Sequence, residues 1–244
     1  MKKLDPISRD GITLSEYDSV AHDGLLLGMK LDEKQVRYYE SIGDDDVKVV
    51  FCEAPAGSGK TTLAFAAADR LVKVNKSYEG IIYMMAPYGE QRQGYLPGSI
   101  TEKSEVYFEP AYQAMLKCGI NPYVAVSKES LTDRKYDDSY ITLLTNTFIR
   151  GTNFENKVVI IDEAQNFTEH ELRTAISRIH DSCKLIVIGH DLQCDLKDYS
   201  MSGFAKCRWH FRVNYPDITS VCWLTENYRG KISKAADEIW EVNA

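Results

Sequence analysis

One stretch of this sequence, VKVVFCEAPAGSGKTTL at residues 47–63, limits what the chain can fold into more than any other. The apolar run 47–52 has the length and the β-branched content of a buried strand. Small residues and glycines follow and predict a tight turn, and then comes a helical pattern with Leu63, Ala67 and Leu71 on one face. A strand, a glycine-rich loop, Lys-Thr and a helix in this order are typical of a phosphate-binding loop (P-loop).

The chemistry of a polyphosphate site accounts for each part of this stretch. Small residues let backbone N–H groups surround phosphate oxygens, and the N-terminus of the next helix adds partial positive charge. We expect Lys60 to reach the β- and γ-phosphates and the Thr61 hydroxyl to ligate Mg²⁺. An ordinary glycine-rich turn is the alternative. The predicted nucleotide-binding residues of the loop are Ala54, Pro55, Ala56, Gly57, Ser58, Gly59, Lys60, Thr61 and Thr62.

A second apolar run, residues 157–161, ends in Asp162 and Glu163. The ends of parallel strands lie at the nucleotide crevice, so we expect Asp162 to hold Mg²⁺ and Glu163 to orient or deprotonate an attacking water. Gln193 follows another apolar run and could sense a γ-phosphate, although a polar loop glutamine is the alternative. Gln35 precedes the P-loop strand, where its amide could pair with adenine or simply lie on a helix surface.

Strand and helix patterns alternate along the chain, which predicts an α/β fold with a mainly parallel, doubly wound sheet flanked by helices. A length of 244 residues with 44% hydrophobic content suffices for one sizeable core. We therefore expect an N-terminal arm over residues 1–30 and a single domain over 31–244. The predicted strands are 47–52, 80–85, 140–144, 157–162, 184–189 and 217–223. Helices are predicted over 101–117, after an Asp32 cap and after a Thr168 cap with Glu171 at the capping-box position, and residues 88–98 are predicted to form a loop.

The composition limits the partners and the compartment. A formal net charge of −7 provides no global basic field, so nucleic acid would need a local patch. One candidate is a run in which basic and aromatic residues alternate, although a solvated helix face with core aromatics is an equal alternative. Its members are Lys206, Arg208, Trp209, His210, Phe211 and Arg212. Six cysteines without a C-x-x-C pair, no apolar segment of transmembrane length and no secretion signal predict a soluble, cytoplasmic protein that binds no membrane.

Several motifs together resemble the PhoH family of ATPases over roughly residues 31–215. They are APAGSGKT, GYLPG, FIRGTNF, VVIIDEAQN, the Gly189 to Gln193 strand end and SGF. The P-loop and DEAQ are shared with superfamily 1 helicases, and NYRG near the C-terminus is similar to a helicase motif whose arginine faces the γ-phosphate. Three positions depart from the family pattern, with Ala54 for Gly, Ala86 for Arg and His190 for Asp.

The resemblance implies a RecA-like ATPase core, with nucleotide roles for the P-loop, Asp162, Glu163, Gln193, Gln35 and Arg229. Some PhoH relatives are fused to an RNase-type domain and linked to RNA unwinding, and a short form looks like those carried by bacteriophages. This protein is therefore expected to act in a bacterial or phage-infected cell. ATP is expected rather than GTP, because no N-K-x-D motif is present.

The main hypothesis is an Mg²⁺-dependent ATPase, with Lys60, Glu163, Gln193 and Arg229 as catalytic residues. An arginine from a neighbouring subunit, Arg150 or Arg178, could complete the site, which predicts a homo-oligomer such as a ring. Turnover coupled to single-stranded RNA or DNA is a separate hypothesis. A non-catalytic, ATP-dependent switch that binds a protein partner is the second class, and a phosphotransferase is the third.

Overall fold

The computed structural model describes residues 29–86, 106–127, 139–146 and 151–235. Its centre is a sheet in the order β3-β2-β4-β5-β1-β6, in which all neighbours are parallel. One strand, β5, separates the P-loop strand β1 from the acidic strand β4. The strands are β1 Val49–Glu53, β2 Gly80–Met85, β3 Ile141–Thr145, β4 Lys157–Asp162, β5 Lys184–Gly189 and β6 Thr219–Trp223. The predicted fold class is confirmed.

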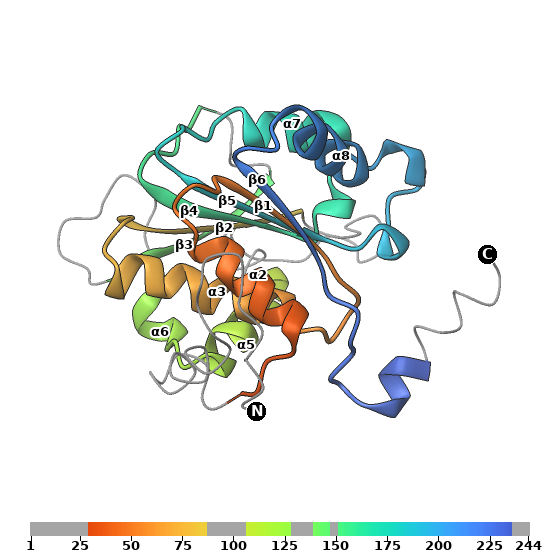
Figure 1. Cartoon of the computed structure of the whole chain (residues 1–244), viewed down its shortest axis with the longest axis horizontal. Coiled ribbons are helices and arrows are strands. Elements are labelled where there is room, and N and C mark those ends of the chain that lie inside the picture. The colour runs from red at the N-terminus through yellow and green to blue at the C-terminus, as the bar shows by residue number, and fades with distance from the viewer. Residues whose placement is uncertain (1–28, 87–105, 128–138, 147–150, 236–244) are drawn as a thin grey trace, which may run out of the picture.

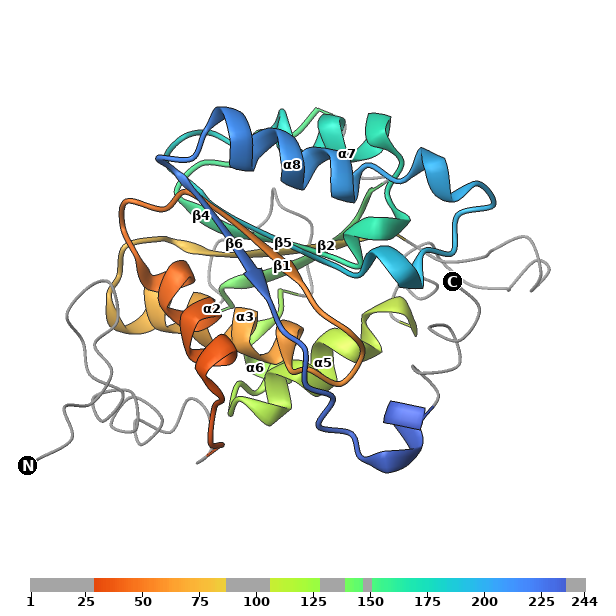
Figure 2. The same ribbon diagram turned by 45° about the vertical axis from the view of Figure 1, so that its right-hand side comes forward.

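Helices cover both faces of the sheet (Figures 1 and 2). One face carries α2 Glu33–Gly43, α3 Lys60–Asp69, α5 Glu109–Lys117 and α6 Pro122–Ala125. The other carries α7 Glu169–Ile176 and α8 Phe204–Asn214. A π-helical segment, η1 Arg70–Val74, continues α3. The short 3₁₀ helices are η2 Val106–Phe108, η4 Ala164–Asn166, η5 Asp191–Gln193 and η6 Tyr199–Met201.

Because both faces are covered, the central strands are apolar on both sides. In β1, Val50 and Cys52 pack in the core beneath α2 and α3, while Val49 and Phe51 pack in the core beneath α7 and α8. The alanine-rich helix α3 is buried almost all round, since small side chains let it lie close to the sheet and its neighbouring helices. The P-loop helix is therefore rigidly seated.

Two predicted helix starts are present with full capping boxes. Asp32 caps α2 together with Gln35, and Thr168 caps α7 together with Glu171. The predicted helix 101–117 is observed as η2 and α5 within the described range. The loop 88–98 and Arg150 lie outside the described residues, as does most of the predicted arm 1–30.

The six cysteines all lie within the described residues and are unpaired. Over the described ranges, no helix combines the length and apolar character that a membrane crossing requires.

Candidate nucleotide site

The P-loop connects the carboxyl end of β1 to α3. Gly57 and Gly59 have φ angles of +77° and +83°, in the left-handed region that glycine enters without a Cβ penalty. Lys60 is the first residue of α3, and its amine folds back over the loop to donate to the Ala54 carbonyl at 3.3 Å. The loop thus turns at two glycines, and the Lys60 amine lies against its first residue.

The hydroxyl of Thr61 donates to Asp162 Oδ2 at 2.8 Å, although the two residues are 101 positions apart. Tyr83, on β2, donates to the same oxygen at 2.9 Å, and the Glu163 N–H donates to Oδ1 at 2.9 Å. Burial of Asp162 and the adjacent Glu163 raise its pKa, while Lys60 opposes the shift. A hydroxyl beside a carboxylate offers the hard oxygen ligands that Mg²⁺ prefers, so the donor set fits this ion. Tyr83 was not predicted, because it reads as one more residue of a buried strand.

Glu163 has a φ of +50°, which is uncommon for a residue with a side chain. Its Oε1 lies 4.0 Å from the Lys60 amine, and its Oε2 accepts a hydrogen bond from Gln165 at 2.6 Å. Left-handed residues with side chains are often found at functional sites, where their strain is supported by the surrounding structure. The backbone turn directs this carboxylate towards the P-loop lysine.

Gln165, which the sequence analysis did not single out, joins Glu163 to the turn after β5. Its side chain is 1% exposed, and its amide nitrogen also donates to the Gln193 carbonyl at 3.1 Å. Its Oε1 accepts from the His190 N–H at 3.0 Å. We call residues 190–193 the sensor turn. The signal available in the sequence was a glutamine two residues after the second acid.

Gln35 lies against the P-loop, 6% exposed. Its Nε2 donates to the Ser58 carbonyl at 2.9 Å, and its Oε1 accepts from the Asp32 N–H at 3.1 Å. The amide is therefore engaged with the loop and the helix cap. Pairing with adenine would have to compete with these two bonds.

The chain after β6, residues 224–230, crosses the P-loop and is called the C-terminal strap (Figure 2). The Tyr228 N–H donates to the Gly57 carbonyl at 2.9 Å, and its hydroxyl donates to Asp32 at 2.5 Å. A Cβ on Gly57 would lie 2.6 Å from Asn227 Oδ1 and 2.8 Å from Arg229 Cγ. The strap thus brings Arg229 to the P-loop.

The predicted basic patch is not a single surface. Residues two apart on a helix point about 200° away from each other, so the alternating basic residues divide around α8. Lys206 pairs with Glu169 at 2.7 Å, while Arg208 turns inward and pairs with Glu53 and Asp191. Phe211 packs against Phe51, with ring centroids 5.7 Å apart. The prediction of one basic, aromatic face is therefore wrong.

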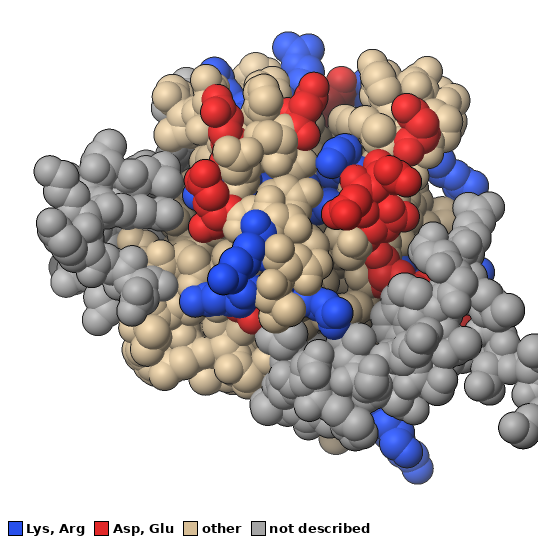
Figure 3. All heavy atoms as spheres, turned by 60° about the vertical axis from the view of Figure 1, so that its left-hand side comes forward, with Lys and Arg blue, Asp and Glu red and all other residues tan. Residues whose placement is uncertain are grey.

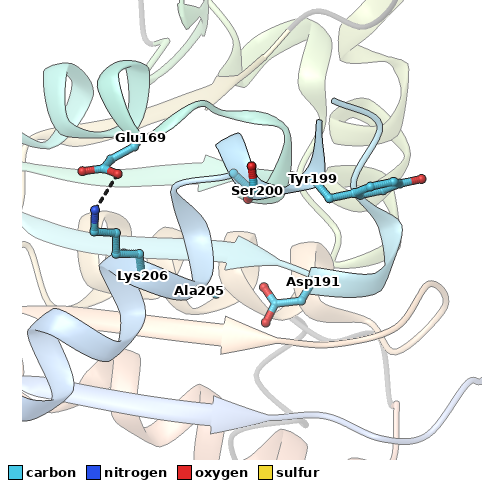
Figure 4. Close-up of a pocket in the computed structure, with 7 residues that line it drawn as sticks. Glu169, Asp191, Tyr199, Ser200, Ala205 and Lys206 are labelled. Carbon is cyan, nitrogen blue, oxygen red and sulfur yellow. Dashed lines mark hydrogen bonds and ion pairs between the residues drawn. The ribbon is translucent and has the colours of Figure 1, made fainter. Parts of the chain in front are cut away.

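Charges of both signs are also mixed on another face of the molecule. Figure 3 shows one face on which basic and acidic side chains are interspersed among uncharged residues. A pocket of about 410 Å³ lies beside the sensor turn. In Figure 4, Asp191 lies below the Glu169–Lys206 ion pair at this pocket. Its lining mixes acids, one lysine, hydroxyls and a tyrosine, so its chemistry does not define a ligand.

Arg178 lies at the opposite edge of the sheet. Its carbonyl accepts from the Phe154 N–H at 2.9 Å, just before β4 begins. It does not join the P-loop of its own chain.

The fold, the P-loop and the hydroxyl–carboxylate pair define a P-loop NTPase. More specifically, the chain belongs to the PhoH-like protein family, whose profile matches residues 29–235. It is 32% identical over 170 residues to a PhoH-like protein of Synechocystis, covering 70% of this chain and 49% of that one. It is 30% identical over 175 residues to Protein PhoH of Escherichia coli, covering 71% and 47%. The chain thus spans about half the length of these relatives.

Similar solved structures include the UvsW helicase from bacteriophage T4 and the large terminase from a thermophilic bacteriophage. The first has 14% identity and a TM-score of 0.48, covering 91% of this chain and 69% of that one. The second has 15% identity and a TM-score of 0.49, covering 86% and 50%.

Proposed function

We propose that this chain is an Mg²⁺-dependent ATPase. The observation that carries the proposal is the contact between Thr61 and Asp162, with the Lys60 amine 4.0 Å from Glu163. The P-loop cation, the hydroxyl and both acids meet at the carboxyl edge of the sheet, where open α/β sheets bind nucleotides.

Each residue of the site has a role that follows from its chemistry. Lys60 and the loop N–H groups hold the polyphosphate, and the Glu163 carboxylate accepts the proton of the attacking water. Thr61 and Asp162 would hold Mg²⁺, which neutralises the charge that develops on the phosphate oxygens. Gln193 responds to the γ-phosphate, and Arg229 supplies positive charge from the strap.

His190 stands where the PhoH family has Asp, and this difference does not change the roles proposed above. The turn is held through the His190 N–H, which donates to Gln165, and a backbone group is retained whatever side chain stands there. The acid displaced by one position, Asp191, has a partner of its own in Arg208.

We further propose that turnover responds to single-stranded RNA or DNA and that the protein acts as a homo-oligomer. On α8, the Trp209 side chain is 63% exposed, which suits stacking of an unpaired base.

The test is phosphate release from Mg-ATP, with and without single-stranded RNA or DNA, for wild type, Lys60→Ala and Glu163→Gln. Glu79→Gln, an exposed acid paired with Lys157, is a matched control that should not change turnover. Loss of a general base costs about 10²–10⁴-fold in rate, so Glu163→Gln should bind ATP but release almost no phosphate.

Each outcome separates the candidates. Stimulation by a strand, lost in both variants, supports the coupled ATPase. Turnover that strands do not change would reject the coupling but keep the ATPase. ATP binding without turnover in any condition would replace it with the nucleotide-dependent switch. Sedimentation with and without nucleotide tests the oligomer, and a monomer with full turnover would contradict it.

A further inference from the structure

Arg208 holds together two parts of the site that are not adjacent in sequence. Its guanidinium pairs with Glu53, the last residue of β1, and donates to Asp191 Oδ2 at 2.9 Å. The side chain is only 16% exposed, and the guanidinium lies over the Phe204 ring, 5.0 Å from its centroid. One cation thus bridges the residue that precedes the P-loop and the first residue of η5.

This bridge balances the negative charges around it. Two carboxylates, 19% and 33% exposed, face one guanidinium, and the His190 ring lies 4.0 Å from the first of them. Without Arg208, Glu53 and Asp191 would repel each other at a partly desolvated point. Since Glu53 is fixed by β1, the sensor turn is the part that would move.

Two side chains besides Arg208 hold the sensor turn. On the β1 side, the Glu53 carboxylate accepts a hydrogen bond from the Asp191 backbone and lies 4.0 Å from the His190 ring. Gln165 binds the backbone of the turn at the His190 N–H and the Gln193 carbonyl. Arg208 binds it through a side chain, from the α8 side of the sheet. A planar guanidinium can engage two carboxylates at once, which an ammonium group does less well.

We infer that Arg208 is a positioning residue that sets the sensor turn against the P-loop and so lets the site distinguish a nucleoside triphosphate from a diphosphate. The inference rests on the proposed function for its substrate class. It assigns a role to a residue that the basic-patch hypothesis had placed on a nucleic-acid surface. A residue with a merely structural role would change stability and the affinity for both nucleotides alike.

The experiment compares the affinities for a non-hydrolysable ATP analogue and for ADP, both with Mg²⁺, by calorimetry. Wild type should prefer the triphosphate, and Arg208→Met should lose about tenfold of that preference while the ADP affinity changes less than about twofold. Arg208→Lys should fall in between. Lys206→Met, two residues away in an exposed ion pair, is the matched control and should leave the ratio unchanged.

A double-mutant cycle that combines Arg208→Met with Asp191→Asn tests whether Arg208 acts through Asp191. If Arg208 acts through Asp191, the double variant should lose no more of the preference than Arg208→Met alone. Equal losses for both nucleotides, an unchanged ratio or additive losses would each overturn the inference. If Arg208→Met fails to fold, Arg208→Lys and Asp191→Asn carry the same comparison.

The nucleotide affinities can be measured without turnover. The proposed ATPase activity and the proposed role of Arg208 can therefore fail separately. A wild type that binds the triphosphate tightly but never hydrolyses it would overturn the proposed ATPase and leave this inference standing. Wild type that binds neither nucleotide would overturn both.

Discussion

The side-chain amide of Gln35 donates to the carbonyl oxygen of Ser58 at 2.9 Å, which ties the first turn of α2 to the P-loop. The other end of the same amide accepts from the Asp32 N–H. One side chain therefore both caps a helix and anchors a phosphate-binding loop, so these two effects must be separated by mutation.

We predict that Gln35→Ala weakens ATP and GTP binding by the same factor, because the residue supports the loop and not the base. It should also lower the free energy of unfolding by about 1–2 kcal/mol, since a buried bond and the cap are lost. Gln35→Glu retains the capping acceptor and should lose less stability while still weakening nucleotide binding. Titration with both nucleotides and thermal unfolding measure these effects. A loss confined to ATP would show that Gln35 reads adenine instead.

Gly57→Ala and Gly59→Ala form a matched pair, since both place a Cβ at positive φ, at a cost of about 1–2 kcal/mol each. They differ in what the methyl group meets. At Gly57 it would collide with Asn227 and Arg229, whereas at Gly59 it would rest 3.4 Å from Gln35. We expect only Gly57→Ala to displace the strap and to speed trypsin cleavage after Arg229. Equal cleavage in both variants would contradict the described packing.

Gln165→Leu removes a side chain that makes three hydrogen bonds in a buried place. We expect a loss of about 2–3 kcal/mol in stability, because the His190 N–H and the Gln193 carbonyl lose their partner. Turnover should fall by about 10²-fold, since Glu163 and the sensor turn would no longer be held in register. Mg-ATP affinity should change much less. The measurement is kcat beside the nucleotide dissociation constant, and a fall in affinity as large as the fall in kcat would contradict the assignment.

Lys184 is buried at the amino end of β5, where its amine donates to the carbonyls of Asp44 and Val47. Burial lowers its pKa to about 8. The unfolded chain therefore binds more protons than the folded one above pH 8, so this residue's contribution to stability rises from about pH 8 to about pH 10.

Buried thiols act in the opposite direction, because burial raises the pKa of Cys222 and of Cys183. The contribution of Lys184 is therefore measured as the difference in the free energy of unfolding between wild type and Lys184→Met. That difference should move in favour of wild type by roughly 1–3 kcal/mol between pH 8 and pH 10 in urea unfolding. A difference that stays constant across this range would mean that the amine is charged at pH 10 in the folded protein.

Sequence patterns predicted the elements better than the contacts between them. Each predicted strand appears within two residues of its expected bounds, because buried parallel strands read as continuous apolar runs. Local chemistry likewise predicted the caps at Asp32 and Thr168.

Contacts that depend on tertiary packing were harder to predict. Arg208 reads as one of several exposed cations, yet its face of α8 turns towards Glu53 and Asp191. In a helix such as α8, where basic and aromatic residues occur on every side, the spacing does not show which face will pack against the sheet. Tyr83 and Gln165 were missed for a related reason, since each gains its role only from the side chain that the fold places beside it.

The C-terminal strap also bears on the order in which the chain is made. Tyr228 meets Asp32 across 196 positions of sequence, and all six strands precede it. A ribosome therefore synthesises every strand of the sheet and the complete glycine-rich motif before it adds the tyrosine that binds Gly57. A chain broken off after Trp223 would keep every residue of that motif and still lack one of its two anchors.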